Sequence, residues 1–161
     1  ENIVKDGDLI DLGKRKLDII AIPAHNESSI AILDWQTRLL FVGDELESGQ
    51  VLLFVRNKNI SLHDVATAHK ANMERLKARR SDYDALCPAH NGVMLDPDTY
   101  IDDYIKLAEE LINGTANTMP NTAGFGFQPD VAEEGGFFAE FGRLERVQHG
   151  QASFIYIKDN K

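Results

Sequence analysis

The chain has 161 residues, 43% of them hydrophobic and 27% charged, which suffices for one ordinary core and predicts a single domain over residues 1–161. Its 26 acidic residues outnumber the 17 basic ones, and the resulting net charge of −9 repels phosphate backbones and argues against nucleic acid as a partner. The chain lacks a run of roughly 18 apolar residues that could span a membrane and a signal-peptide pattern, and its one cysteine cannot form an internal disulfide, so we expect a cytoplasmic protein with no membrane partner.

The first third of the chain has the pattern of short strands. A hairpin is predicted from Ile3 to Leu12, with Asp6-Gly7 as its turn. Apolar runs rich in branched residues then alternate with short polar stretches, as expected of buried neighbouring strands. These runs cover residues 17–23, 29–34, 39–44 and 51–55.

Two helices are predicted in the middle of the chain. Ser61 and Asp64 have the spacing of a helix cap, and apolar residues recur at helical spacing from Leu62 to about residue 80. The second helix lies within residues 96–114, with proline in its first turn and glycine as its stop. Between the helices, "YDALCPAH" is typical of a strand followed by a loop.

The last part of the chain has weaker signals. Residues 115–134 contain Gly, Pro, Asn and Thr without a clear period, which indicates a surface loop. Residues 137–148 and 152–158 are predicted to form a final strand pair that turns at His149-Gly150.

A potential metal ligand follows the end of three predicted strands. His25 comes after Pro-Ala, Asp44 after Gly43, and His90 after a second Pro-Ala. Strands fix where such donors point, while the loops supply the bend that aims them at one place. Each residue alone has an ordinary explanation as a loop histidine or a turn aspartate, but the combination predicts that His25, Asp44 and His90 form a metal site.

The segment "LDIIAIPAHNESSIAILDWQTRLLFVGDEL", followed by "YDALCPAHNG", resembles the metallo-β-lactamase superfamily of metal-dependent hydrolases. The resemblance covers roughly residues 3–113. It implies an α/β fold, namely the C-terminal half of an αββα sandwich with a mixed sheet and outer helices, in residues 1–114. Residues 115–161 would add a loop and the final strand pair to the same domain. By the resemblance, His25 binds a first metal, Asp44 bridges two, and His90 binds the second, with two zinc ions expected in the intact protein.

The superfamily also carries a His-x-His-x-Asp-His segment that should precede His25, and residues 1–24 contain no match. We therefore expect this chain to be an incomplete portion of such a protein, inactive alone. A lone half would expose an apolar sheet face, so we expect the N-terminal half of the same fold, or a partner chain, to cover it.

The resemblance implies that a metal-activated water cleaves an ester, thioester, lactone, amide or phosphoester in a small-molecule substrate. Residues 45–59 and 115–134 are candidate substrate-selecting loops. One alternative is a non-catalytic binding or scaffold module with a degenerate metal site, and another is a plain α/β domain whose histidines coincide by chance. A structural role is favoured for the remaining candidates, which are His63, His69, Cys87, His149, Phe125, Phe127, Phe137, Phe138 and Phe141.

Overall fold

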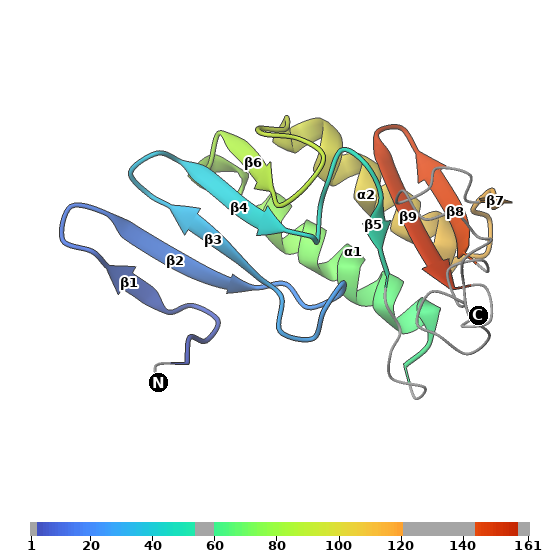
Figure 1. Cartoon of the computed structure of the whole chain (residues 1–161), viewed down its shortest axis with the longest axis horizontal. Coiled ribbons are helices and arrows are strands. Elements are labelled where there is room, and N and C mark those ends of the chain that lie inside the picture. The colour runs from blue at the N-terminus through green and yellow to red at the C-terminus, as the bar shows by residue number, and fades with distance from the viewer. Residues whose placement is uncertain (1–2, 54–59, 121–143, 158–161) are drawn as a thin grey trace, which may run out of the picture.

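A computed structural model describes residues 3–53, 60–120 and 144–157 of the chain (Figure 1). A short 3₁₀ turn at Arg80–Asp82 follows the first helix. The strands and helices are β1 (Leu9–Asp11), β2 (Lys16–Ala21), β3 (Ile30–Asp34), β4 (Leu39–Gly43), β5 (Val51–Leu52), α1 (Leu62–Ala78), β6 (Ala85–Pro88), α2 (Pro97–Ile112), β7 (Met119–Pro120), β8 (Leu144–His149) and β9 (Ala152–Ile157).

The strands form two mixed sheets. The first has the order β1-β2-β3-β4-β6, with antiparallel neighbours except for the parallel pair β4 and β6. The second has the order β5-β9-β8-β7, in which β5 and β9 are parallel. A parallel pair needs a long crossover connection, and the connection from β4 to β6 passes through β5 and α1. This confirms the predicted α/β class with a mixed sheet and outer helices.

Both helices begin at capping side chains that the sequence indicated. Ser61 accepts a hydrogen bond from the Asp64 amide, while the Asp64 carboxylate accepts one from the Ser61 amide, which completes a capping box for α1. Asp96 caps α2 by accepting from the Thr99 amide, and Pro97 occupies the first turn. The caps therefore fix where α1 and α2 start against the sheets.

One hydrophobic cluster joins both helices to both sheets. Ile20, Leu33 and Leu40 contribute to it from the first sheet, and Phe154 from the second. The helices lie behind the strands in the view of Figure 1. His69 of α1 is fully buried within this core, which agrees with its predicted structural role.

The other face of the first sheet carries a row of apolar side chains that does not belong to this cluster. The strand register places Ile19 opposite Ile32, Ile32 opposite Phe41, and Phe41 opposite Cys87. Directly opposed residues share a face of the sheet, so these four form one row, which we call the open-face row. Phe41 in this row is 44% exposed, whereas Ile19 and Cys87 are buried.

The predicted turn at Asp6-Gly7 is present, but residues 3–8 form no strand, so the predicted hairpin between Ile3 and Leu12 is wrong. The first hairpin joins β1 to β2 by a turn in which the Leu12 amide donates a hydrogen bond to the Arg15 carbonyl. Asp6 instead serves long-range contacts, because its carboxylate accepts from the Ala21 amide at 2.8 Å and pairs with Arg75 of α1 at 2.7 Å. These contacts tie the segment before β1 to the end of β2, so it does not become a strand.

The predicted loop at residues 115–134 contains the short strand β7, which pairs with β8. The final strand pair is confirmed as β8 and β9. Residues 121–134, the start of the predicted strand at 137–143, and the five phenylalanines from Phe125 to Phe141 lie outside the described residues. In the part of the chain that the structure covers, no helix is both long and apolar enough to cross a membrane.

Candidate metal centre

The three predicted ligands lie on loops at the same edge of the first sheet. Strand β2 runs antiparallel to β3, and β3 runs antiparallel to β4, so β2 and β4 point the same way. Strand β6 is parallel to β4. The carboxyl ends of all three strands therefore share one edge, and His25, Asp44 and His90 each follow one of these ends.

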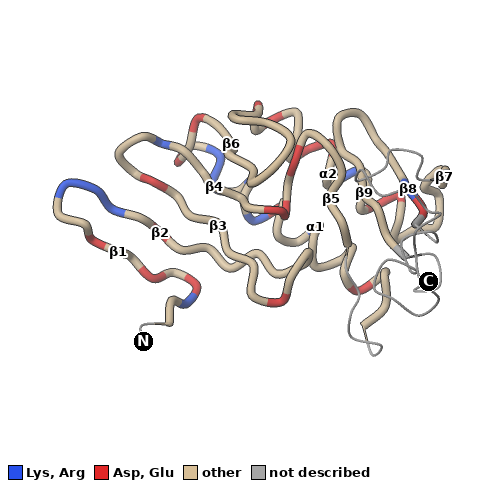
Figure 2. The backbone as a smooth tube through the Cα atoms, in the orientation of Figure 1, with Lys and Arg blue, Asp and Glu red and all other residues tan. Residues whose placement is uncertain are grey.

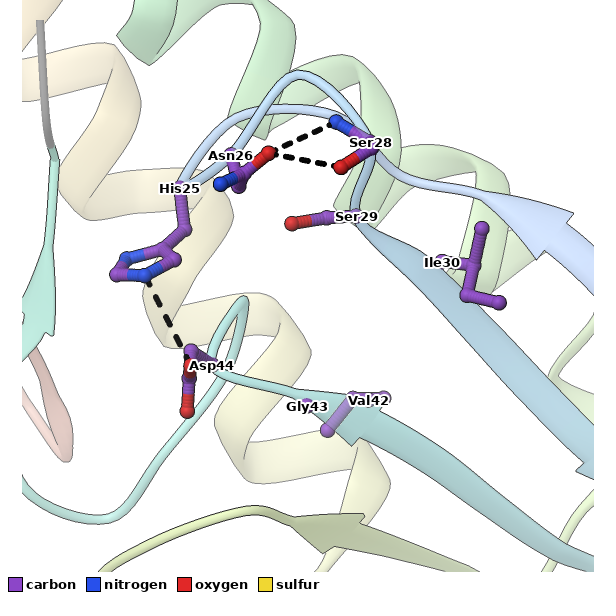
Figure 3. A pocket seen from close by; sticks show the side chains of 8 residues that line it. All are labelled: His25, Asn26, Ser28, Ser29, Ile30, Val42, Gly43 and Asp44. Atoms are coloured by element: carbon purple, nitrogen blue, oxygen red, sulfur yellow. Dashed lines mark hydrogen bonds and ion pairs between the residues drawn. The ribbon is translucent and has the colours of Figure 1, made fainter. Parts of the chain in front are cut away.

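Asp44 lies between the two histidines. Its Oδ2 is 3.8 Å from Nε2 of His25, and its Oδ1 is 3.4 Å from Nε2 of His90. Figure 3 shows the His25 ring facing the Asp44 carboxylate. The structure thus brings together all three residues, with each imidazole next to a different oxygen of one carboxylate.

The hydrogen bond between His25 and Leu52 determines which ring nitrogen of His25 carries the hydrogen. Nδ1 lies 2.6 Å from the backbone carbonyl of Leu52 in β5. A carbonyl only accepts, so Nδ1 carries the hydrogen, and in the neutral ring Nε2 presents its lone pair. Two electron-rich atoms, Nε2 and Asp44 Oδ2, then face each other, an arrangement that a proton or a cation between them would stabilise.

The distances fit ligands that share an ion. In a tetrahedral zinc site with bonds of about 2.1 Å, two ligand atoms lie about 3.4 Å apart. The separation between His90 and Asp44 has this value, and that between His25 and Asp44 is slightly longer. In addition, Asp44 Oδ1 is buried and accepts no hydrogen bond from the described residues. The donor set therefore fits a metal ion, while the role of the three residues as ligands stays a prediction.

The backbone around the site has two tight bends. Gly43 has a φ of 58°, a conformation that favours glycine, and it turns the chain at the end of β4 so that Asp44 follows at the edge. The Gly43 carbonyl accepts from the Ala89 amide at 3.0 Å, which holds the loop of His90 next to that of Asp44. Asn91, with a φ of 52°, bends the chain directly after His90.

Two buried carboxylates beside the site were not predicted from the sequence. Glu47 is 5% exposed, and its Oε2 accepts from Asn91 Nδ2 at 2.7 Å, which links the loops of Asp44 and His90. Burial raises the pKa of Glu47, and the nearby charge of Asp44 raises it further. Glu45 is buried as well, and burial raises its pKa despite several hydrogen bonds. The run of acidic residues after Gly43, visible as red segments after β4 in Figure 2, was the available signal.

A polar cavity of about 260 Å³ adjoins His25 and Asp44. Asn26 Oδ1 accepts from the backbone and the hydroxyl of Ser28 at its rim. The cavity could hold a small polar part of a ligand next to the candidate centre. It is lined by His25, Asn26, Ser28, Ser29, Ile30, Val42, Gly43 and Asp44 (Figure 3).

The remaining histidines and the cysteine have other surroundings. His63 is mostly exposed on α1, and His149 Nδ1 lies 2.7 Å from Glu110. Cys87 is buried in β6, and burial raises the pKa of its thiol. Within residues 3–53, 60–120 and 144–157, no three or more His, Cys, Asp or Glu side chains form a group that could hold a metal ion by themselves. His25 and His90 each face a different oxygen of Asp44, so the described residues offer one imidazole and one carboxylate oxygen at each side of that carboxylate.

Comparison with solved structures identifies the class of fold. A β-lactamase domain protein from Burkholderia ambifaria superposes with a TM-score of 0.55 and 15% identity, covering 68% of this chain and 33% of that chain. A metallo-β-lactamase family protein from Thermus thermophilus reaches a TM-score of 0.47 at 18% identity, covering 69% and 34%. The chain has the metallo-β-lactamase fold, as its resemblance to that superfamily implied.

Among curated proteins, the chain is similar to the acyl-coenzyme A thioesterase MBLAC2. The human protein is 36% identical over 59 residues, which are 37% of this chain and 21% of that protein. The protein from Gallus gallus is 32% identical over the same length and shares. The similarity thus spans about a fifth of the length of these relatives. No protein-family model matches the chain.

Proposed function

We propose that the chain is part of a metal-dependent hydrolase in which His25, Asp44 and His90 bind two metal ions, zinc by preference, with Asp44 as the bridge. One observation carries this proposal: the two oxygens of one carboxylate face Nε2 atoms of two different histidines, at 3.8 and 3.4 Å. Imidazole and carboxylate donors suit zinc. The further donors that each ion needs would come from another segment of the parent protein or from a partner chain.

Bound zinc would lower the pKa of a water towards neutrality and polarise the carbonyl that this water attacks. The protein's own residues prepare the place for that chemistry. Leu52 holds His25 in the tautomer that presents Nε2 to the centre. The hydrogen bond from Asn91 to Glu47 holds the loop of His90 against the loop of Asp44. The polar cavity next to His25 leaves room for substrate.

A thioester is the substrate class that we propose first, among the esters, thioesters, lactones, amides and phosphoesters that a metal-activated water can cleave. The support is the similarity to acyl-coenzyme A thioesterases. The net charge of −9 disfavours the close approach of a polyanion such as coenzyme A at low salt. A neutral thioester of N-acetylcysteamine therefore belongs in the assay next to acyl-coenzyme A.

We further propose that a second sheet of the same fold covers the open-face row. Phe41, which is 44% exposed, supports the idea, because a covering sheet would remove its ring from water; Ile19 and Cys87 of the same row are already buried within the chain. The covering sheet would belong to further residues of the same polypeptide or to a partner chain. A cytoplasmic location is also part of the proposal, since a buried thiol such as Cys87 suits a reducing compartment.

The test uses the full-length parent protein. Metal content is measured by mass spectrometry and thioester hydrolysis by thiol release. The proteins compared are the wild type, Asp44→Asn and the matched control Asp102→Asn. Asp102 is an exposed residue of α2 that pairs with Lys77 of α1. We expect two zinc equivalents and turnover in the wild type and the control, and at least a 100-fold loss of turnover in Asp44→Asn. Metal without turnover would support a binding module instead. Absence of metal in a folded wild type would refute the proposed centre.

A further inference from the structure

Glu45 connects two of the loops that carry candidate ligands. It directly follows Asp44, and its side chain reaches the loop of His25. Its Oε1 accepts hydrogen bonds from the backbone amides of His25 at 2.7 Å and Ala24 at 3.1 Å. The Asn26 amide lies 3.4 Å from the same oxygen. Three consecutive amides therefore converge on one carboxylate oxygen.

This carboxylate is placed at some cost to stability. Glu45 is only 1% exposed, and a carboxylate buried this deeply is unfavourable unless hydrogen bonds or a charged partner compensate. The amides supply charge-assisted hydrogen bonds that offset part of this cost. The hydrogen bonds of Glu45 are therefore directed at the main chain that carries His25, and they hold that main chain in place.

The other contacts of Glu45 and His25 anchor both to the rest of the fold. The Glu45 backbone carbonyl accepts from His69 Nε2 of α1 at 2.7 Å, and His69 is fully buried. The His25 ring is held at its other side by Leu52 of β5 at 2.6 Å. A continuous set of hydrogen bonds thus runs from α1 through Glu45 to the loop of His25, and from the His25 ring to β5.

We propose that Glu45 is a positioning residue that sets the separation between His25 and Asp44. Glu45 is bonded to Asp44 in the chain and hydrogen-bonded to the loop of His25, so this one residue fixes the position of both candidate ligands. This inference rests on the proposed metal-binding function. It goes beyond that function because it assigns a task to a side chain that does not itself face His90 or the Asp44 carboxylate in any described contact.

The experiment uses the full-length protein and compares Glu45→Leu, which removes the acceptor, with Glu45→Gln, which keeps an oxygen for the amides. Val147→Ala, a core change in β8, controls for a general loss of stability. Zinc affinity is measured by competition with a chromophoric chelator. We expect Glu45→Leu to bind zinc about 10- to 100-fold more weakly. We expect the zinc affinities of Glu45→Gln and Val147→Ala to stay within about threefold of the wild type, a smaller change than that of Glu45→Leu.

A second readout reports on His25 itself and needs no metal. The ring nitrogen chemical shifts of His25 in the metal-free protein should show a protonated Nδ1 in the wild type and Glu45→Gln, and tautomer averaging in Glu45→Leu. If Glu45→Leu does not fold, hydrogen exchange of the His25 amide in the wild type decides the matter, because the proposal requires that this amide be protected.

The two proposals fail in different ways. A folded wild type that binds no zinc refutes the metal centre, but a protected His25 amide and a fixed tautomer would still support the positioning role. Zinc binding by Glu45→Leu that equals that of the wild type overturns the role of Glu45, even if the metal centre exists. Rapid exchange of the His25 amide in the wild type overturns it as well.

Discussion

The loops at the sheet edge and the core around His69 differ in how far their polar groups are exposed, because the side chains of His25, Asp44 and His90 are 22%, 39% and 69% exposed while His69 is fully buried. In the core, the Tyr104 hydroxyl donates to the Glu47 carbonyl, and His69 donates to the Glu45 carbonyl. At the edge, His25 Nε2 and the Asp44 carboxylate face each other across 3.8 Å, and Asp44 Oδ1 accepts no hydrogen bond from the described residues. His69 Nδ1 in the core also has no hydrogen-bond partner among the described residues. The core is therefore held by packing around buried groups, whereas the edge presents groups that solvent or a ligand can reach.

The largest effect on this comparison should come from the core. Phe154 is fully buried, and its ring packs edge-on against His69 at 4.8 Å between centroids. Phe154→Ala should lower the free energy of unfolding by about 3–5 kcal/mol, because it leaves a cavity in a close-packed region. Urea unfolding of the full-length protein measures this loss. A loss below about 1 kcal/mol would show that the region is not tightly packed.

A somewhat smaller effect should follow from pH. Burial lowers the pKa of His69 from 6.5 to about 4, so the folded protein keeps the ring neutral while the unfolded chain protonates it below 6.5. The unfolded state then binds more protons between these values, and stability falls as the pH drops from 6.5 towards 4. The maximum contribution is about 3 kcal/mol.

The matched variant for this measurement is His69→Phe, which fills the site without titrating. The free energy of unfolding is measured at pH 7.5 and pH 4.5. Its decrease between these two pH values should be larger for the wild type than for the variant. Parallel curves for the two proteins would show that His69 is not held in its neutral form by the core.

The smallest effect on stability should come from the edge. The His90 side chain is 69% exposed, so His90→Ala should change the free energy of unfolding by less than about 0.5 kcal/mol. The same change should weaken zinc binding at least 10-fold if His90 is a ligand. His63→Ala, at 61% exposure on α1, is the control and should leave both quantities unaltered. A stability loss as large as that of Phe154→Ala would contradict the separation of the two regions.

Local patterns sufficed for much of the fold. The runs of branched residues located β2, β3 and β4, and Ser61 with Asp64 located the start of α1, because these signals depend on neighbours in sequence. The first hairpin was misplaced because Asp6 is used by Arg75, a partner that lies far along the chain. No pattern of neighbours shows such a contact.

The candidate site was predictable to a similar degree. His25, Asp44 and His90 could be named because each follows a strand end, and the structure brings them together. Glu45 and Glu47 could not, because a charged residue in a loop is ordinarily solvated, and only the assembled fold buries these two. The apolar run at residues 51–55 predicted the strand that contains β5, but the hydrogen bond of His25 to Leu52 joins segments far apart in the chain, and no local pattern shows it.

The parallel pairing of β4 with β6 has a consequence for the order of folding. Asp44 and His90 meet only after the long connection through α1 has closed, and closure over such a span is slower than the formation of a hairpin. If the proposed centre binds zinc, the ion should therefore bind after collapse of the polypeptide, and zinc added during refolding should not accelerate the early phases.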